Sequence, residues 1–121
     1  MQTHILLIED NHSLRRLYAR TLRDNDFIVT EAEDLFTARQ LIAQMRYDVI
    51  VCDIQLTDGL ATDFMEEIHD LGTPILAISS DERYQQICDE LGLEGFMRKP
   101  IPTRLLAPNI MKILGHGSAL A

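Results

Sequence analysis

Five side chains that can bind metal ions or phosphoryl groups stand at or near the ends of short apolar runs in this sequence. Glu9 and Asp10 follow one such run, and Asp53 ends another. Ser79 closes a third run, and Lys99 comes shortly after a fourth. A carboxylate in such a place is a candidate nucleophile or metal ligand, while a hydroxyl and an ammonium can bind phosphoryl oxygens. These residue types predict a site for metal or phosphoryl chemistry.

Each of these residues also has an ordinary structural explanation. Asp53 could start a turn or cap the next helix. Lys99 could be an exposed turn lysine and Ser79 a helix cap, and the charges of Glu9 and Asp10 could favour the start of the helix that follows them. Because all of them coincide with predicted strand ends, we favour one shared site.

Strand and helix patterns alternate along the chain, and this alternation brings the strand ends together. Strands are predicted at His4–Ile8, 27–30, Val49–Asp53, 74–78 and 96–97. Helices are predicted near 13–22, 35–45, 62–71, 82–91 and 103–114. The run before Asp53 has no polar alternation, which is typical of a parallel strand buried on both faces. Five strands alternating with five helices predict a doubly wound α/β fold, whose parallel strands all end at the same edge of the sheet.

Helical spacing also predicts which side chains face the core and where the helices begin. The caps expected from residue type are Asn11 or Ser13, Asp34, the cluster 79–81 and Thr103. Pro108 is expected to be tolerated early in the last helix, or otherwise to kink it. The apolar residues expected to face inward, helix by helix, are Leu14, Leu17, Tyr18 and Leu22; Ala38, Leu41, Ile42 and Met45; Phe64, Ile68 and Leu71; Tyr84, Ile87, Cys88 and Leu91; and Leu106, Ile110, Ile113 and Leu114.

The three carboxylates Glu9, Asp10 and Asp53 would repel one another at a common edge unless a cation lies among them. Hard oxygen ligands of this kind suit Mg²⁺ or another divalent cation. A carboxylate beside bound Mg²⁺ can attack a phosphoryl group to give an acyl phosphate. Lys99 would then supply a point charge, and Ser79 a hydrogen-bond donor, to the phosphoryl oxygens.

Composition narrows the class of protein. The chain has 121 residues, which is the size of one domain, and no apolar run long enough to span a bilayer. Its formal net charge of −8 argues against direct binding to nucleic acid or to an anionic membrane. Two cysteines and no export signal at the N-terminus lead us to expect a soluble, cytoplasmic protein.

Four segments, taken in order, resemble the receiver domain of two-component response regulators. They are residues 5–11 (ILLIEDN), 48–59 (DVIVCDIQLTDG), 74–80 (PILAISS) and 95–100 (GFMRKP). The resemblance covers nearly the whole chain and implies one CheY-like, flavodoxin-like domain over 1–121, with the sheet order 2-1-3-4-5 and with 115–121 as a tail or the start of a linker. It implies a sensor histidine kinase or a phosphotransfer protein as partner, and leaves a homodimer open.

The resemblance also implies a role for each site residue. Asp53 is the implied phosphoacceptor, Glu9 and Asp10 with the backbone carbonyl of Gln55 are implied metal ligands, Ser79 is the switch hydroxyl, Lys99 the site lysine and Phe96 the switch aromatic. A cis bond is implied between Lys99 and Pro100. The domain would phosphorylate and dephosphorylate itself and would not be an enzyme acting on a separate substrate.

Two other functions share these features. An aspartate-nucleophile phosphohydrolase would use the same Asp53 and Mg²⁺, but Gln55 stands where such enzymes have a second acid. A receiver-like module that serves only for contacts is disfavoured because every chemical position is filled. The chain departs from the family pattern at Thr57, Ala61 and Ser80, which could reshape the loop after Asp53 and the access to the site.

Overall fold

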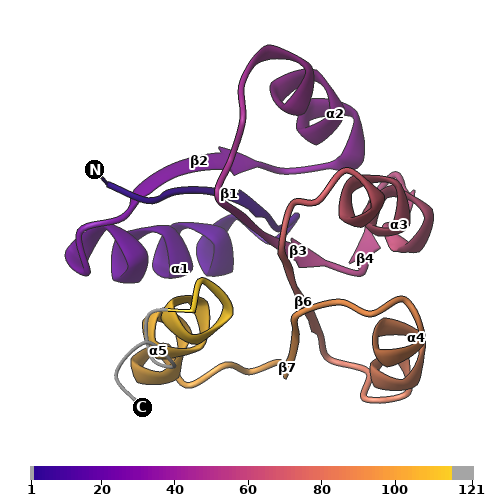
Figure 1. The fold of residues 1–121 in the computed structure, drawn as a ribbon. Helices are drawn as coiled ribbons and strands as arrows, with labels where there is room; N and C mark the ends of the chain where they lie inside the picture. The colour runs from indigo at the N-terminus through magenta and orange to yellow at the C-terminus, as the bar shows by residue number, and fades with distance from the viewer. Residues whose placement is uncertain (1, 116–121) are drawn as a thin grey trace.

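A central parallel sheet of five strands organises the molecule, whose computed structural model describes residues 2–115 (Figure 1). The order of the strands across the sheet is β2-β1-β3-β6-β7, and all neighbours are parallel. This is the predicted doubly wound order, with β6 and β7 as the fourth and fifth strands of the sheet. The strands are β1 (His4–Ile8), β2 (Ile28–Ala32), β3 (Val49–Asp53), β6 (Ile75–Ser79) and β7 (Gly95–Arg98).

Five helices cover the two faces of this sheet (Figure 1). Helices α1 and α5 pack on one face, and α2, α3 and α4 pack on the other. Two helix caps are as predicted, because Asn11 accepts a hydrogen bond from the backbone of Leu14 and Asp34 accepts one from Thr37. The helices are α1 (His12–Asp24), α2 (Leu35–Gln44), α3 (Thr62–Asp70), α4 (Tyr84–Glu90) and α5 (Thr103–Ile113).

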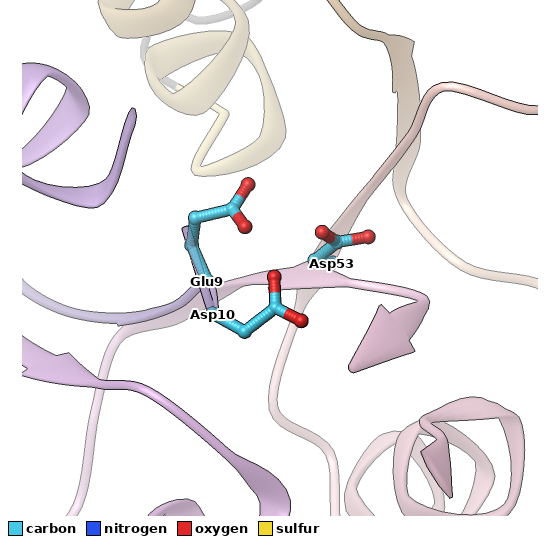
Figure 2. Close-up of side chains that lie close together, drawn as sticks. All are labelled: Glu9, Asp10 and Asp53. Atoms are coloured by element: carbon cyan, nitrogen blue, oxygen red, sulfur yellow. The ribbon is translucent and has the colours of Figure 1, made fainter. Parts of the chain in front are cut away.

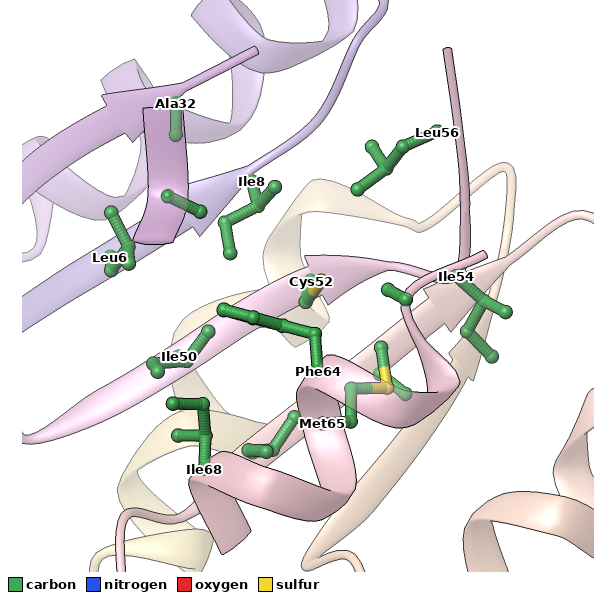
Figure 3. Close-up of a cluster of buried hydrophobic side chains, with 14 of the residues drawn as sticks. Leu6, Ile8, Ala32, Ile50, Cys52, Ile54, Leu56, Phe64, Met65 and Ile68 are labelled. Carbon is green, nitrogen blue, oxygen red and sulfur yellow. The ribbon is translucent and has the colours of Figure 1, made fainter. Parts of the chain in front are cut away.

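The core has two halves because side chains leave a strand on alternate faces. In β1, Leu6 and Ile8 join the half beneath α2, α3 and α4, while Ile5 and Leu7 join the half beneath α1 and α5. Figure 3 shows the first half, with Phe64 and its helical neighbours lying over β3. Every residue of β3 is buried, as its unbroken apolar run predicts. The sheet therefore holds Asp53 in a rigid position.

Several predictions about single elements are wrong. Leu17, Met45, Leu71 and Ile87 are exposed, although helical spacing placed them inward. Their helices bury a narrower stripe than the spacing suggested, and Met45 and Leu71 are the C-cap residues of α2 and α3, where the chain turns away from the sheet.

The predicted starts of two helices also differ from the structure. The N-cap of α5 is Pro102 and not Thr103, which is already helical. The cluster 79–81 ends β6 and precedes a turn at 82–83, and the N-cap of α4, Arg83, has no side-chain cap hydrogen bond. Pro108 lies inside α5.

A small antiparallel hairpin follows β3 and was not predicted. It consists of β4 (Gln55–Leu56) and β5 (Gly59–Leu60), in which Gln55 pairs with Leu60.

No helix within residues 2–115 has the length and apolar content needed to cross a membrane. The predicted tail or linker at 115–121 lies outside the described residues, apart from Gly115.

Candidate functional site

Three carboxylates meet at the carboxyl edge of the sheet. Glu9 and Asp10 follow the last residue of β1, and Asp53 is the last residue of β3, the neighbouring strand. One carboxylate oxygen from each of the three lies within 4.8 Å of the others. Figure 2 shows the three side chains converging from the two strand ends. The parallel topology alone brings together residues that are more than forty positions apart in the sequence.

Lys99 enters this acidic pocket from the loop after β7. Its Nζ donates to Oδ2 of Asp53 at 2.7 Å and to Oε1 of Glu9 at 2.9 Å. The Glu9 side chain is fully buried, the Asp53 side chain is 4% exposed, and the Lys99 side chain is 15% exposed. Because charge-assisted hydrogen bonds strengthen where water is excluded, Lys99 holds the carboxylates of Glu9 and Asp53 close together. The predicted cis bond between Lys99 and Pro100 is confirmed.

The second carboxylate oxygens of Glu9 and Asp53 accept hydrogen bonds from backbone amides. The Asn11 amide donates to Oε2 of Glu9 at 3.0 Å, and the Gln55 amide donates to Oδ1 of Asp53 at 3.2 Å. The second bond places the Gln55 backbone beside the pocket, where its carbonyl is expected to bind a metal ion. The Asp53 carboxylate is therefore oriented through both of its oxygens.

The pKa shifts at the site follow from this crowding. Burial raises the pKa of Asp10, and the hydrogen bond and negative charge of Glu9 raise it further, while Lys99 opposes the shift. For Lys99, burial alone would lower the pKa, but the hydrogen bonds and charges of Asp53 and Glu9 outweigh it, so that its pKa is raised. The pocket holds three carboxylates against one ammonium, which is an environment suited to a divalent cation.

Ser79 is completely buried at the end of β6, beside β3. Its Oγ accepts a hydrogen bond from the backbone amide of Asp81 at 3.0 Å, and its carbonyl accepts one from the Lys99 amide at 2.8 Å. Phe96, on β7, is partly buried and packs against the core half beneath α2, α3 and α4. The structure thus places the expected switch residue Ser79 on β6, the neighbour of β3, and the expected switch residue Phe96 on β7, the neighbour of β6.

Three contributors to the site were missed by sequence reasoning. The Asn11 amide supports Glu9, the Asp81 amide fixes the Ser79 hydroxyl, and Arg15 donates to the Glu9 carbonyl at 2.9 Å. Two of these are backbone groups, which carry no residue-type signal. Asn11 and Asp81 were recognised only as candidate helix caps.

The donor set fits a hard divalent cation. Its ligands are carboxylate oxygens, and the group contains neither a histidine ring nor a thiolate. Asp10 is only partly buried, so a cation can reach it from solvent.

The fold and the site define a class of protein: a flavodoxin-like α/β domain with an acidic pocket and a lysine at the carboxyl edge of its sheet. The sequence model of the response regulator receiver domain matches residues 5–110. The chain belongs to this family, the receiver domains of two-component signalling.

Two curated proteins that are similar in sequence support this family assignment. The chain is 28% identical over 117 residues to the protein PetR of Rhodobacter capsulatus, covering 92% of this chain and 48% of PetR. It is 27% identical over 116 residues to the chemotaxis protein CheY of Pseudomonas aeruginosa, covering 90% of this chain and 94% of CheY. The chain therefore spans about half of one relative and nearly all of the other.

Among solved structures, the response regulator TrrA of Thermotoga maritima, in complex with Mg²⁺ and BeF, superposes with a TM-score of 0.84. It is 18% identical, and the alignment covers 93% of this chain and 99% of TrrA. At this identity the similarity shows a shared fold.

Proposed function

We propose that this chain works as one receiver unit, in which Asp53 accepts a phosphoryl group from a phosphohistidine of a sensor histidine kinase or a phosphotransfer protein. The observation that carries the proposal is the buried ion pair between Asp53 and Lys99, beside the carboxylates of Glu9 and Asp10. The Lys99 ammonium lies 2.7 Å from the carboxylate that would attack the phosphoryl group, so positive charge stands where negative charge would increase.

In the proposed reaction one Asp53 oxygen forms a bond to phosphorus as the bond from phosphorus to the donor's ring nitrogen breaks. The nitrogen keeps the bonding electron pair, and the product on this chain is an acyl phosphate. Lys99 shifts one of its hydrogen bonds from the carboxylate to a phosphoryl oxygen, so positive charge remains where negative charge increases. Ser79 supplies a neutral hydroxyl donor from the next strand.

Asp10 and Asp53, with Glu9 nearby and the Gln55 carbonyl, would hold a Mg²⁺ ion. When bound, such an ion neutralises charge on the transferring group. The raised pKa of Asp10, caused first by burial and then by Glu9, supports this assignment, because a cation would relieve the crowding of negative charge. The chain promotes its own phosphorylation and dephosphorylation and does not turn over a separate substrate.

Incubation with acetyl phosphate and Mg²⁺, followed by intact mass spectrometry, tests the proposal. The wild-type chain should gain the mass of one phosphoryl group, and chelation of the metal should prevent the gain. Asp53→Asn should abolish it. Asp63→Asn, which alters an exposed aspartate at the start of α3, is the matched control and should be phosphorylated like the wild type.

The outcome also separates the rival functions. A phosphohydrolase would also hydrolyse an unactivated phosphate monoester such as p-nitrophenyl phosphate, which should not phosphorylate a receiver, and a module used only for contacts would gain no mass. Phosphorylation that persists in Asp53→Asn would refute the assignment of the acceptor.

A further inference from the structure

A second hollow lies between α2 and α3, near the sheet edge opposite the acidic pocket. Its volume is about 260 Å³, and it is formed by the C-terminal turns of both helices and the first residues of β3. Ile42, Ile50 and Ile68 form apolar walls with the ring of Tyr47. Figure 3 shows Ile50 on the strand and Ile68 on α3 lying near one another. We call this hollow the α2–α3 pocket.

The mouth of the α2–α3 pocket is lined by two apolar side chains that the helical pattern placed in the core. Met45 is 44% exposed and Leu71 is 75% exposed. Both lie where their helices end, so their solvent-facing apolar surface lies around one opening. A ligand with an apolar body would remove this surface from water, which is favourable in proportion to the area covered.

One cation also lines the pocket. Arg46 is exposed and forms no ion pair within residues 2–115, in a chain whose formal net charge is −8. Thr73 adds a hydroxyl at the same opening. Apolar walls with a few polar groups and one charge are the usual make-up of small-molecule sites.

We propose that the α2–α3 pocket binds a small monocarboxylate with an acyl or aryl body. The apolar part would lie on Ile42, Ile50 and Ile68, and the carboxylate would pair with the Arg46 guanidinium, which suits planar carboxylates. A hollow of about 260 Å³ is at the small end of ligand sites, so it matches a short acyl chain and not a folded segment of a partner. The proposal does not depend on phosphorylation of Asp53.

Octanoate is a suitable probe, compared with 1-octanol and octylammonium, which share its body but not its charge. Titrations of the isotope-labelled chain, followed by amide chemical shifts, should show saturable octanoate binding with the shifts centred on α2, α3 and the start of β3. 1-Octanol should bind about tenfold more weakly, because it lacks the charge-assisted hydrogen bonds, and octylammonium more weakly still.

Variants of exposed residues locate the site without threatening the fold. Arg46→Gln should weaken octanoate binding about tenfold and leave 1-octanol binding unchanged. Its control is Arg16→Gln, at an exposed α1 arginine that also forms no ion pair in the part of the chain described. Leu71→Asp should weaken octanoate binding by placing a negative charge at the mouth, whereas Leu60→Asp, the same change at the exposed leucine of β5, should not.

Three binding results would overturn the proposal. They are no saturable octanoate binding, equal affinity for octanoate and octylammonium, or octanoate-induced chemical shifts that are the same in Arg46→Gln and Leu71→Asp as in the wild type. Sedimentation provides a further check. A dimer that forms without octanoate and is abolished by Leu71→Asp would assign the pocket to a contact between two copies of the chain, against the proposal.

Discussion

At the scale of single residues, Lys99 supplies the positive charge that pairs with the two buried carboxylates of the acidic pocket. Glu9 and Asp53 are almost completely buried, and both accept a hydrogen bond from the same ammonium. Removing one partner of a buried ion pair costs more than the pair itself contributes, because the remaining charge is left unpaired in a poorly solvated place. Lys99 therefore has a structural role besides the proposed chemical one.

The substitution Lys99→Met tests this role. It keeps most of the side-chain volume but leaves Glu9 and Asp53 without a cation, so urea denaturation at neutral pH should show a loss of about 3 kcal/mol in the free energy of unfolding. Lys112→Met, at the exposed lysine of α5, should cost less than about 0.5 kcal/mol.

The pH dependence of that loss follows from the pKa of Lys99. Because the folded state raises this pKa above 10.5, the stabilisation by Lys99 is fully present below pH 10.5 and declines only as the pH rises through the folded value. The difference between the wild type and Lys99→Met should therefore be constant from neutral pH to pH 10.5. A difference that vanishes already at neutral pH would show that the buried carboxylates do not need the lysine.

At the scale of elements, the hairpin of β4 and β5 links β3, which ends at Asp53, to α2. Asp58, in the turn of this hairpin, accepts hydrogen bonds from the backbone amides of Leu35 and Phe36, both at 3.0 Å. These amides belong to the first turn of α2, where no intrahelical acceptor is available. Asp34 and Asp58 together cap α2, one from its own segment and one from the loop after Asp53.

The bonds made by Asp58 should be visible as a pH-dependent contribution to stability. The hydrogen bond from Leu35 is the main cause that lowers the pKa of Asp58; burial opposes this shift, and the hydrogen bond from Phe36 adds to it. Asp58→Ala should lower the free energy of unfolding by about 0.5–1 kcal/mol at neutral pH, the lower part of the capping range because the side chain is exposed.

The sign of the pH effect is fixed by the lowered pKa. The stabilisation is present above 3.8, the unfolded value, and is lost as the pH falls through the folded value. Unfolding curves measured over that range should therefore converge for wild type and Asp58→Ala. Asp58→Asn keeps one acceptor oxygen, so it should lose less stability, and its own capping bond should not vary with pH. Equal curves for all three proteins would mean that α2 is capped by Asp34 alone.

Gly95 provides a second prediction at this scale, since it lets α5 approach β7. A Cβ at this position would lie 2.9 Å from Cδ1 of Leu76 and 3.2 Å from Cδ1 of Ile113. Gly95→Ala should therefore lower the free energy of unfolding by about 1–2 kcal/mol, because side chains in a packed core must move. Thermal denaturation would measure this, with Lys112→Ala on the exposed side of α5 as the control. An unchanged melting temperature would show that Leu76 and Ile113 can yield freely.

The elements that the sequence predicts well are those governed by local pattern. The alternation of strands and helices predicts the parallel sheet, and the sheet in turn brings Asp53 to the same edge as Glu9. The hairpin after β3 escaped prediction because its strands have two residues each and depend on a pairing that no periodicity reveals. Met45 and Leu71 were wrongly placed in the core because helical spacing defines a face but not the point at which a helix leaves the sheet.

At the scale of the whole molecule, the sheet separates two sets of helices. The acidic pocket lies at the ends of β1 and β3, whose side chains pack against the helices on both faces. Ser79 lies beside the pocket on β6, and the neighbouring strand β7 carries Phe96. The Ser79 hydroxyl accepts a bond from the Asp81 amide, so it still has a proton to donate elsewhere. A phosphoryl group on Asp53 would offer an acceptor that the unmodified protein lacks, and only such a difference between states can shift an equilibrium.

The last prediction is that Ser79 and Phe96 carry this shift to the face formed by α4, β7 and α5. When Ser79 turns to bond a phosphoryl oxygen, space opens beside β7 that the Phe96 ring can fill. Phe96 has no hydroxyl to keep at the surface, so further burial breaks no hydrogen bond, and its present partial burial is consistent with an inward bias. Addition of beryllofluoride and Mg²⁺ should therefore bury Phe96 further, measured by its ring chemical shifts and by a structure of the complex.

Ser79→Ala separates this coupling from mere binding of the mimic. The variant keeps Asp53, Lys99 and the metal ligands, so beryllofluoride should still bind and shift the amides around Asp53. The Phe96 ring should then stay as it is in the free protein, because the hydroxyl that opens the space is missing. If Phe96 responds in Ser79→Ala as it does in the wild type, the coupling does not run through the Ser79 hydroxyl. A wild-type complex in which Ser79 stays turned away from the mimic would lead to the same conclusion.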